Sequence, residues 1–157
     1  MSGAGAPEKG GIDGRGLDVV VVAGTWHETI SNGLIAGAQR VLDEARATHR
    51  LVRVPGSFEL AVAAQAAFAG GADAVVALGV IIRGGTPHFE YVSAAATDGL
   101  TRVSLDAGKP VGFGLLTLDD EKQGLDRAGL PGSKEDKGAE AADAALRTAL
   151  VIRELRG

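Results

Sequence analysis

The sequence predicts an α/β fold, a three-layer α/β/α sandwich around a four-stranded parallel sheet. Apolar runs alternate along the chain with segments in which apolar residues recur at helical spacing. The run at residues 74–82 has nine residues and no polar member, which is typical of a strand buried on both faces of a parallel sheet. Because the crossovers between parallel strands are right-handed, we expect the connecting helices to cover both faces.

Three of the predicted strands are apolar runs, residues 49–54 form a weaker strand pattern, and each strand ends at a turn rich in Gly, Pro or polar residues. The strands are expected at residues 18–23, 49–54, 74–82 and 110–118. Helices are expected after Ser31 or Asn32, either of which could be the N-cap, at about 58–69, over Tyr91 to Val103, in a short piece ending at 128–129, and at about 138–156. This order of elements is flavodoxin-like.

The length of 157 residues is that of one domain. Residues 17–157 are expected to form it. Residues 1–16 contain six glycines and, after Met1, one large apolar residue, Ile12. This composition predicts a flexible N-terminal segment, unless a neighbouring subunit captures it.

Composition narrows the class of partner. Sixteen Lys and Arg against twenty Asp and Glu give a net charge of −4 without a basic block, which argues against nucleic acid. The chain has no cysteine, so it can form neither a disulfide nor a thiolate metal site, and a reducing compartment, the cytoplasm, is favoured. No apolar run has the length of a bilayer span or of a signal peptide. We therefore expect small-molecule ligands, and neither a membrane nor a metal.

The segment that follows residues 74–82 carries groups suited to chemistry. Ligands of parallel sheets bind just past the carboxyl ends of the strands. Here Gly84 and Gly85 let main-chain N–H groups approach an anion without an intervening Cβ, and Thr86 adds a hydroxyl. His88 follows, and histidine is the residue type that exchanges protons near neutral pH. We call residues 84–87 the glycine loop and expect a ligand there.

Aromatic residues gather near the same end of the predicted sheet. Of the six in the chain, Trp26, Phe58 and Phe89 each lie within a few positions of a strand's expected carboxyl end, and Phe113 lies in the fourth strand. An exposed ring there offers a stacking surface for a planar heterocycle. On the residues alone, Trp26 suits this role and that of a cover over the end of the sheet equally well.

The run from Gly79 to Val92, Gly-Val-Ile-Ile-Arg-Gly-Gly-Thr-Pro-His-Phe-Glu-Tyr-Val, resembles the signature of the lumazine synthase (6,7-dimethyl-8-ribityllumazine synthase) family. Further segments that match this family in order and spacing are residues 23–27, 54–60, 99–105, 114–117, 126–129 and 136–138. The resemblance extends from Leu17 to the C-terminus. Gly85 stands where the family generally carries a polar side chain, so its contact is expected through the main-chain N–H.

The resemblance implies a transferase of riboflavin biosynthesis that needs no cofactor. It would condense 5-amino-6-(D-ribitylamino)uracil with 3,4-dihydroxy-2-butanone 4-phosphate, with loss of phosphate and water. The implied catalytic residue is His88. The implied substrate-binding residues are Trp26, Ser57, Phe58, Glu59, Val80, Ile81, Ile82, Gly85, Thr86, Phe113 and Arg127.

The implied roles divide by substrate. Trp26 would stack on the pyrimidine, residues 57–59 would hold the ribityl chain, and the main chain of residues 80–82 would read the uracil edge. Gly85, Thr86 and Arg127 would bind the phosphate, and His88 would move protons. Phe113 and Arg127 would come from a neighbouring subunit.

Independent chemistry agrees with two of these roles. Imine formation and phosphate elimination need proton transfer near neutral pH, which suits His88. A dianionic phosphate suits the planar, permanently charged guanidinium of Arg127. Lys137 is a further candidate for the phosphate. For Arg83 and Glu90, a structural ion pair and a ligand contact both remain open.

Two other classes of function remain open: a flavodoxin-like protein that binds a lumazine or flavin without turnover, and a shell-forming structural protein. The resemblance implies a homopentamer as the base unit and riboflavin synthase as a candidate partner. The segment from Leu130 to Lys137 is longer than the turn typical of family members that form sixty-subunit shells. A free pentamer is therefore expected, with a decamer or a 60-mer as the alternative.

Overall fold

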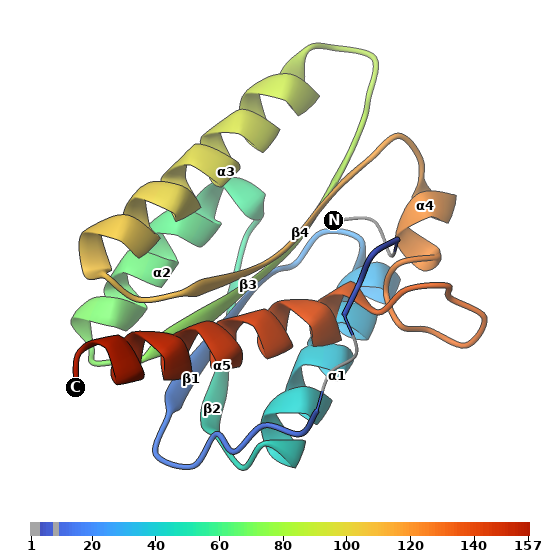
Figure 1. The fold of residues 1–157 in the computed structure, drawn as a ribbon. Helices are drawn as coiled ribbons and strands as arrows, with labels where there is room; N and C mark the ends of the chain where they lie inside the picture. The colour runs from blue at the N-terminus through green and yellow to red at the C-terminus, as the bar shows by residue number, and fades with distance from the viewer. Residues whose placement is uncertain (1–3, 8–9) are drawn as a thin grey trace.

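A sheet of four parallel strands forms the centre of the computed structural model, which describes residues 4–7 and 10–157. The strands are β1 (Asp18–Gly24), β2 (Thr48–Val54), β3 (Ala74–Ile82) and β4 (Val111–Leu118), in the order β2-β1-β3-β4. Helices α1 (Glu28–Glu44) and α5 (Lys137–Leu155) cover one face, and α2 (Leu60–Ala69) and α3 (His88–Ala107) cover the other (Figure 1). The predicted three-layer sandwich with four parallel strands is confirmed.

Alternation along the strands divides the core into two layers. In β1, Val19 and Val21 pack toward α1 and α5, whereas Val20 and Val22 pack toward α2 and α3. All four are buried, as expected for a strand with a helical layer on each face. The edge strand β2 differs, because Leu51 and several polar neighbours are exposed. This explains why residues 49–54, with two arginines and a histidine, form a weaker strand pattern than the other three.

Small residues bring α1 and α5 unusually close together. A Cβ on Gly138 would overlap the carbonyl oxygen of Leu34, and a Cβ on Gly37 would overlap the Asp136 carboxylate. Asp136 caps α5 by accepting from the Ala139 N–H at 3.2 Å. It also pairs with Arg40 of α1 at 2.6 Å. The chain that enters α5 is therefore fixed directly onto α1.

Two expected boundaries are wrong. The first helix begins at Glu28 rather than after Ser31 or Asn32, and His27, with φ 56°, stands at its N-cap position. The Ser31 hydroxyl instead donates to the carbonyl oxygen of Gly24 at 3.0 Å. In the second unit, a 3₁₀ turn at Ser57–Glu59 precedes α2, so the α-helix starts at Leu60.

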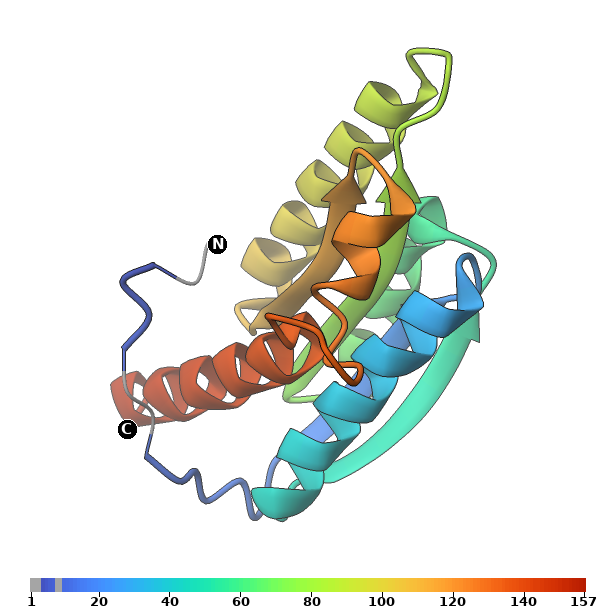
Figure 2. The ribbon, with the colours of Figure 1, turned by 90° about the vertical axis from the view of Figure 1, so that its right-hand side faces the viewer.

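The remaining connections lie at the two ends of the sheet. The segment from β3 into α3 extends beyond the other connections, and the short helix α4 (Glu121–Leu125) lies beside β4 (Figure 2). Of residues 1–16, the predicted flexible segment, 1–3 and 8–9 lie outside the described residues. Gly14, which is described, is buried and donates its N–H to Ala45 O at 2.7 Å. The flexibility of this segment stays a prediction.

The contact between α1 and α5 can be tested at Gly138. Gly138→Ala forces the two helices apart, because the added methyl group overlaps the main chain at Leu34. Overpacking of this kind costs about 1–3 kcal/mol, and we expect a loss near the upper end in urea denaturation. Gly11→Ala is the control, since a Cβ there meets nothing within 4 Å. Equal stability of the two variants would contradict the close helix contact.

Candidate functional site

The site lies where β3 extends beyond its pairing with the neighbouring strand β1. Pairing between these strands ends at Ala23 and Leu78, whereas β3 pairs with β4 as far as Ile82 and Leu118. From Gly79 to Ile82, the edge of β3 that faces β1 has no strand partner. Main-chain polar groups on this edge are thus available to a ligand, on the stretch where the sequence predicts main-chain recognition.

The loop after β1 carries Trp26 and is held from two sides. Thr25 donates to the carbonyl oxygen of Pro55 through its hydroxyl, at 2.7 Å. The Gly24 carbonyl accepts from Arg53 at 3.0 Å as well as from Ser31. The Trp26 side chain is 67% exposed. The ring is therefore presented to solvent on an anchored loop.

The turn after β2 places three predicted residues beside β3. Ser57 is buried, and a Cβ on Gly79 would lie 2.6 Å from its Oγ, so Gly79 makes room for this serine. Glu59 Oε1 accepts from the Gly56 N–H at 2.9 Å. Phe58 is 64% exposed. One oxygen of Glu59 is therefore occupied within the turn, and Oε2 remains for a ligand.

These elements enclose one cleft of about 600 Å³. Its lining contains eight of the predicted site residues: Trp26, Ser57, Phe58, Glu59, Val80, Ile81, Ile82 and His88. His27, Gly56 and Val92 complete it. His88 reaches the cleft from the first residue of α3. The structure thus brings the imidazole of His88, two exposed aromatic rings and the free edge of β3 together.

The glycine loop precedes His88 and is exposed along its length, outside the residues that line the cleft. Thr86 Oγ1 lies 3.5 Å from the His88 N–H, which donates to it. The main-chain N–H groups of Gly84, Gly85 and Thr86 find no acceptor within the described part of the chain. They are free to meet an anion beside His88.

Phe113 and Arg127 do not join this cleft. They line a second cleft of about 460 Å³ along β4, together with Lys137 and Glu135. Because β4 flanks β3 on the side opposite β1, the two clefts lie on different sides of β3. Within one chain, the predicted site is therefore split in two.

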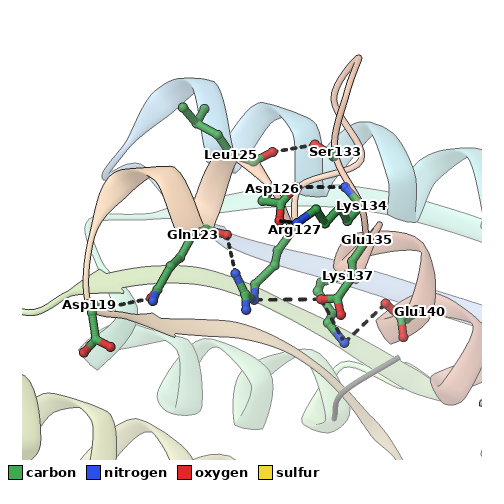
Figure 3. A network of polar contacts seen from close by, with 10 residues as sticks. All are labelled: Asp119, Gln123, Leu125, Asp126, Arg127, Ser133, Lys134, Glu135, Lys137 and Glu140. Carbon is green, nitrogen blue, oxygen red and sulfur yellow. Dashed lines mark hydrogen bonds and ion pairs between the residues drawn. The ribbon is translucent and has the colours of Figure 1, made fainter. Parts of the chain in front are cut away.

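The second cleft holds a network of charges (Figure 3). Arg127 Nη1 donates to the Gln123 carbonyl oxygen at 2.9 Å, and Arg127 Nε lies 3.8 Å from Glu135 Oε2. Lys137 Nζ lies 3.5 Å from the same carboxylate oxygen and 3.4 Å from Glu140 Oε2. An isolated bridge between Ala128 and Asp136 holds the two segments side by side. Both cations are thus oriented by the chain itself.

The sequence that forms these two clefts is similar to known proteins along almost its whole length. The sequence model of the 6,7-dimethyl-8-ribityllumazine synthase family matches residues 16–153. The chain belongs to this family. It is 75% identical over 158 residues to the 6,7-dimethyl-8-ribityllumazine synthase of Leifsonia xyli subsp. xyli, with full coverage of both chains. It is 71% identical to that of Clavibacter michiganensis subsp. michiganensis, covering 100% of this chain and 99% of the relative.

A less similar relative also matches over almost the whole length of both chains. The protein of this name from a Nocardioides species is 62% identical over 156 residues, covering 99% of this chain and 97% of the relative. The family and these relatives are named as 6,7-dimethyl-8-ribityllumazine synthases, and this chain is accordingly an enzyme of the transferase class. The residues that line the two clefts all fall within the part of the chain that the family model matches.

Sequence reasoning missed Glu135, which lies between Arg127 and Lys137 in the second cleft. An acidic residue two positions before the candidate lysine was the available signal. His27, which follows Trp26, is exposed and also lines the first cleft. Within residues 4–7 and 10–157, no cluster of three or more His, Asp or Glu could hold a metal ion, and no helix is long and apolar enough to cross a membrane.

Proposed function

We propose that this lumazine synthase family member condenses 5-amino-6-(D-ribitylamino)uracil with 3,4-dihydroxy-2-butanone 4-phosphate, releasing phosphate and water. The observation that carries the proposal is the first cleft. There, exposed aromatic rings, an unpaired stretch of β3 and His88 surround a volume of about 600 Å³. Steady-state turnover of the two purified substrates, followed by product absorbance, tests it directly. A protein that only binds lumazine or flavin would give no product.

The pyrimidine occupies the first cleft. Trp26 stacks on the heterocycle, and the main chain of Val80, Ile81 and Ile82 pairs with the uracil edge, which the missing strand partner of β3 supports. The ribityl chain runs along Ser57, Phe58 and Glu59. Because Glu59 Oε1 already accepts from Gly56, the ribityl hydroxyls donate to Oε2.

The phosphate of the second substrate binds at the glycine loop. Gly85 contributes its main-chain N–H, Thr86 adds its N–H and hydroxyl, and the free N–H groups of this loop support that role. His88, next in the chain, moves protons while the amine forms the imine and while phosphate leaves. No cofactor takes part in these steps.

Phe113 and Arg127 complete the site from a neighbouring subunit. Their place in a cleft on the far side of β3 supports this, because one chain's own His88 and Arg127 line separate clefts. A ring of five, in which each interface joins two different surfaces, supplies one such completion per subunit. We propose a cytoplasmic homopentamer, with a decamer or 60-mer as the alternative and riboflavin synthase as a candidate partner. Light scattering distinguishes the assemblies.

His88→Ala should lower kcat far more than it changes substrate affinity. General acid and base assistance contributes roughly 10²- to 10⁴-fold to a rate. Some turnover should survive, because the uracil amine is itself a nucleophile and the cleft still orients both substrates. His49→Ala is the control, since His49 pairs with Asp43 outside both clefts. Wild-type kcat in the His88 variant at neutral pH would refute the role.

Arg127→Ala should raise the KM of the butanone phosphate and leave that of the pyrimidine nearly unchanged. Arg127→Lys should restore only part of the loss, because an ammonium group cannot meet two phosphate oxygens as a planar guanidinium does. Arg102→Ala, which alters an exposed arginine on α3, is the control. Equal losses for both substrates would instead make Arg127 an interface residue.

The shared site can be tested by mixing subunits. His88→Ala and Arg127→Ala chains, unfolded together and reassembled at equal ratio, should regain roughly a quarter of the intact sites, because each good site needs an intact His88 from one chain and an intact Arg127 from the next. Activity no higher than the mean of the two parents would show that both residues serve the same chain's site.

A further inference from the structure

The glycine loop has little internal structure of its own. A Cβ on Gly84 or Gly85 would meet nothing within 4 Å, so no packing restrains these residues. Their N–H groups and that of Thr86 have no acceptor in the described chain. The hydrogen bonds of the loop lie at its C-terminal end, where Thr86 Oγ1 accepts from the His88 N–H at 3.5 Å and the Pro87 carbonyl oxygen accepts from the N–H groups of Glu90 and Tyr91. The conformation of the loop must therefore be imposed at its ends.

Arg83, the residue before the loop, joins these ends. Its Nη1 donates to Glu90 Oε1 at 2.5 Å, and its guanidinium carbon lies 4.3 Å from the centroid of the Phe89 ring. Phe89 and Glu90 lie in the first turn of α3, directly after His88. The Arg83 side chain thus links the end of β3, before the loop, to the first turn of α3, which begins with His88.

Arg83 also fixes the loop to β4. Its main-chain N–H donates to Leu118 O at 2.8 Å, and its Nε donates to Asp119 Oδ1 at 3.2 Å. The Asp119 N–H in turn donates to Gln123 Oε1 at 2.7 Å, and the Gln123 carbonyl accepts from Arg127 (Figure 3). The same contacts therefore lead from the glycine loop to the segment that carries Arg127.

The charge balance argues against direct phosphate binding by Arg83. Its guanidinium is paired with two carboxylates, those of Glu90 and Asp119, and these raise the pKa of Arg83. The pKa of Glu90 is lowered by its own main-chain N–H and by Arg83. A dianion placed against this group would face two negative charges for one positive charge. Because the Arg83 side chain is 47% exposed, these pairs add little to the free energy of unfolding.

We infer that Arg83 is a positioning residue that holds the glycine loop and the first turn of α3 in the geometry that receives the phosphate. It does so through Glu90, Asp119 and the face of Phe89. The inference rests on the proposed function, since it assigns the phosphate to this loop. It separates the role of Arg83 from that of Arg127, which would contact the phosphate itself.

The test compares Arg83→Gln with the double variant Glu90→Gln/Asp119→Asn, which keeps the arginine and removes both its partners. If Arg83 positions the loop, both variants should raise the KM of the butanone phosphate by about tenfold, by analogy with the loss that follows removal of the groups that orient the ligands of a metal site. The KM of the pyrimidine and the thermal midpoint should stay nearly unchanged. Arg102→Gln, which breaks the exposed pair of Arg102 with Asp106, is the control and should behave as wild type.

Opposite signs would overturn the inference. If Arg83 contacted the phosphate, Arg83→Gln would weaken binding, whereas removal of the two carboxylates would leave it unchanged or strengthen it. Unchanged KM values in both variants would overturn it as well. Should the wild-type protein not turn over the substrates, the proposed function fails. The binding of inorganic phosphate to the same variants, measured by calorimetry, then tests the role of Arg83 separately. Both test variants should bind phosphate more weakly than the wild type and Arg102→Gln do.

Discussion

The unequal pairing of β3 is the constraint on which the rest of the site depends. Its apolar residues, buried on both faces, fix the strand at the centre of the molecule, and β4 supports it along its full length. On the other side, β1 stops at Gly24 and its chain turns away through Trp26. That early exit leaves main-chain groups of β3 uncovered and opens the space that the aromatic rings and His88 border.

Polar groups on the two sides of β3 are used differently. Around the first cleft, the N–H groups of the glycine loop and one oxygen of Glu59 are left for a ligand. In the second cleft, Arg127 and Lys137 share the Glu135 carboxylate, so both cations are oriented and partly neutralised by the chain itself. Free hydrogen-bond donors thus lie on one side of β3, and cations already paired with carboxylates lie on the other.

The sequence was sufficient for the strands and their helical layers, because the apolar runs and the helical spacing directly reflect burial. It failed at the start of α1, where Ser31 is of a residue type that often caps helices. The Ser31 hydroxyl instead donates to the carbonyl oxygen of Gly24 on β1, a contact that only the folded chain provides. The site residues of the first cleft came from a family resemblance combined with strand ends. The division into two clefts depends on which side of β3 each strand occupies, and apolar patterns do not specify strand order. Arg83 was left undecided because its partners Glu90 and Asp119 lie seven and 36 residues away.

The covering of one sheet face by α1 and α5 has a consequence for synthesis. These helices are the first and the last to be made, with almost the whole sheet between them in the chain. Until residues 137–155 leave the ribosome, Leu34 of α1 and the residues of β3 and β4 on this face lack the helix that covers them. Domains whose contacts are so distant in sequence fold slowly and expose apolar surface while they wait. The nascent chain therefore exposes this part of the sheet until α5 docks, whereas the layer built from α2 and α3 can form earlier.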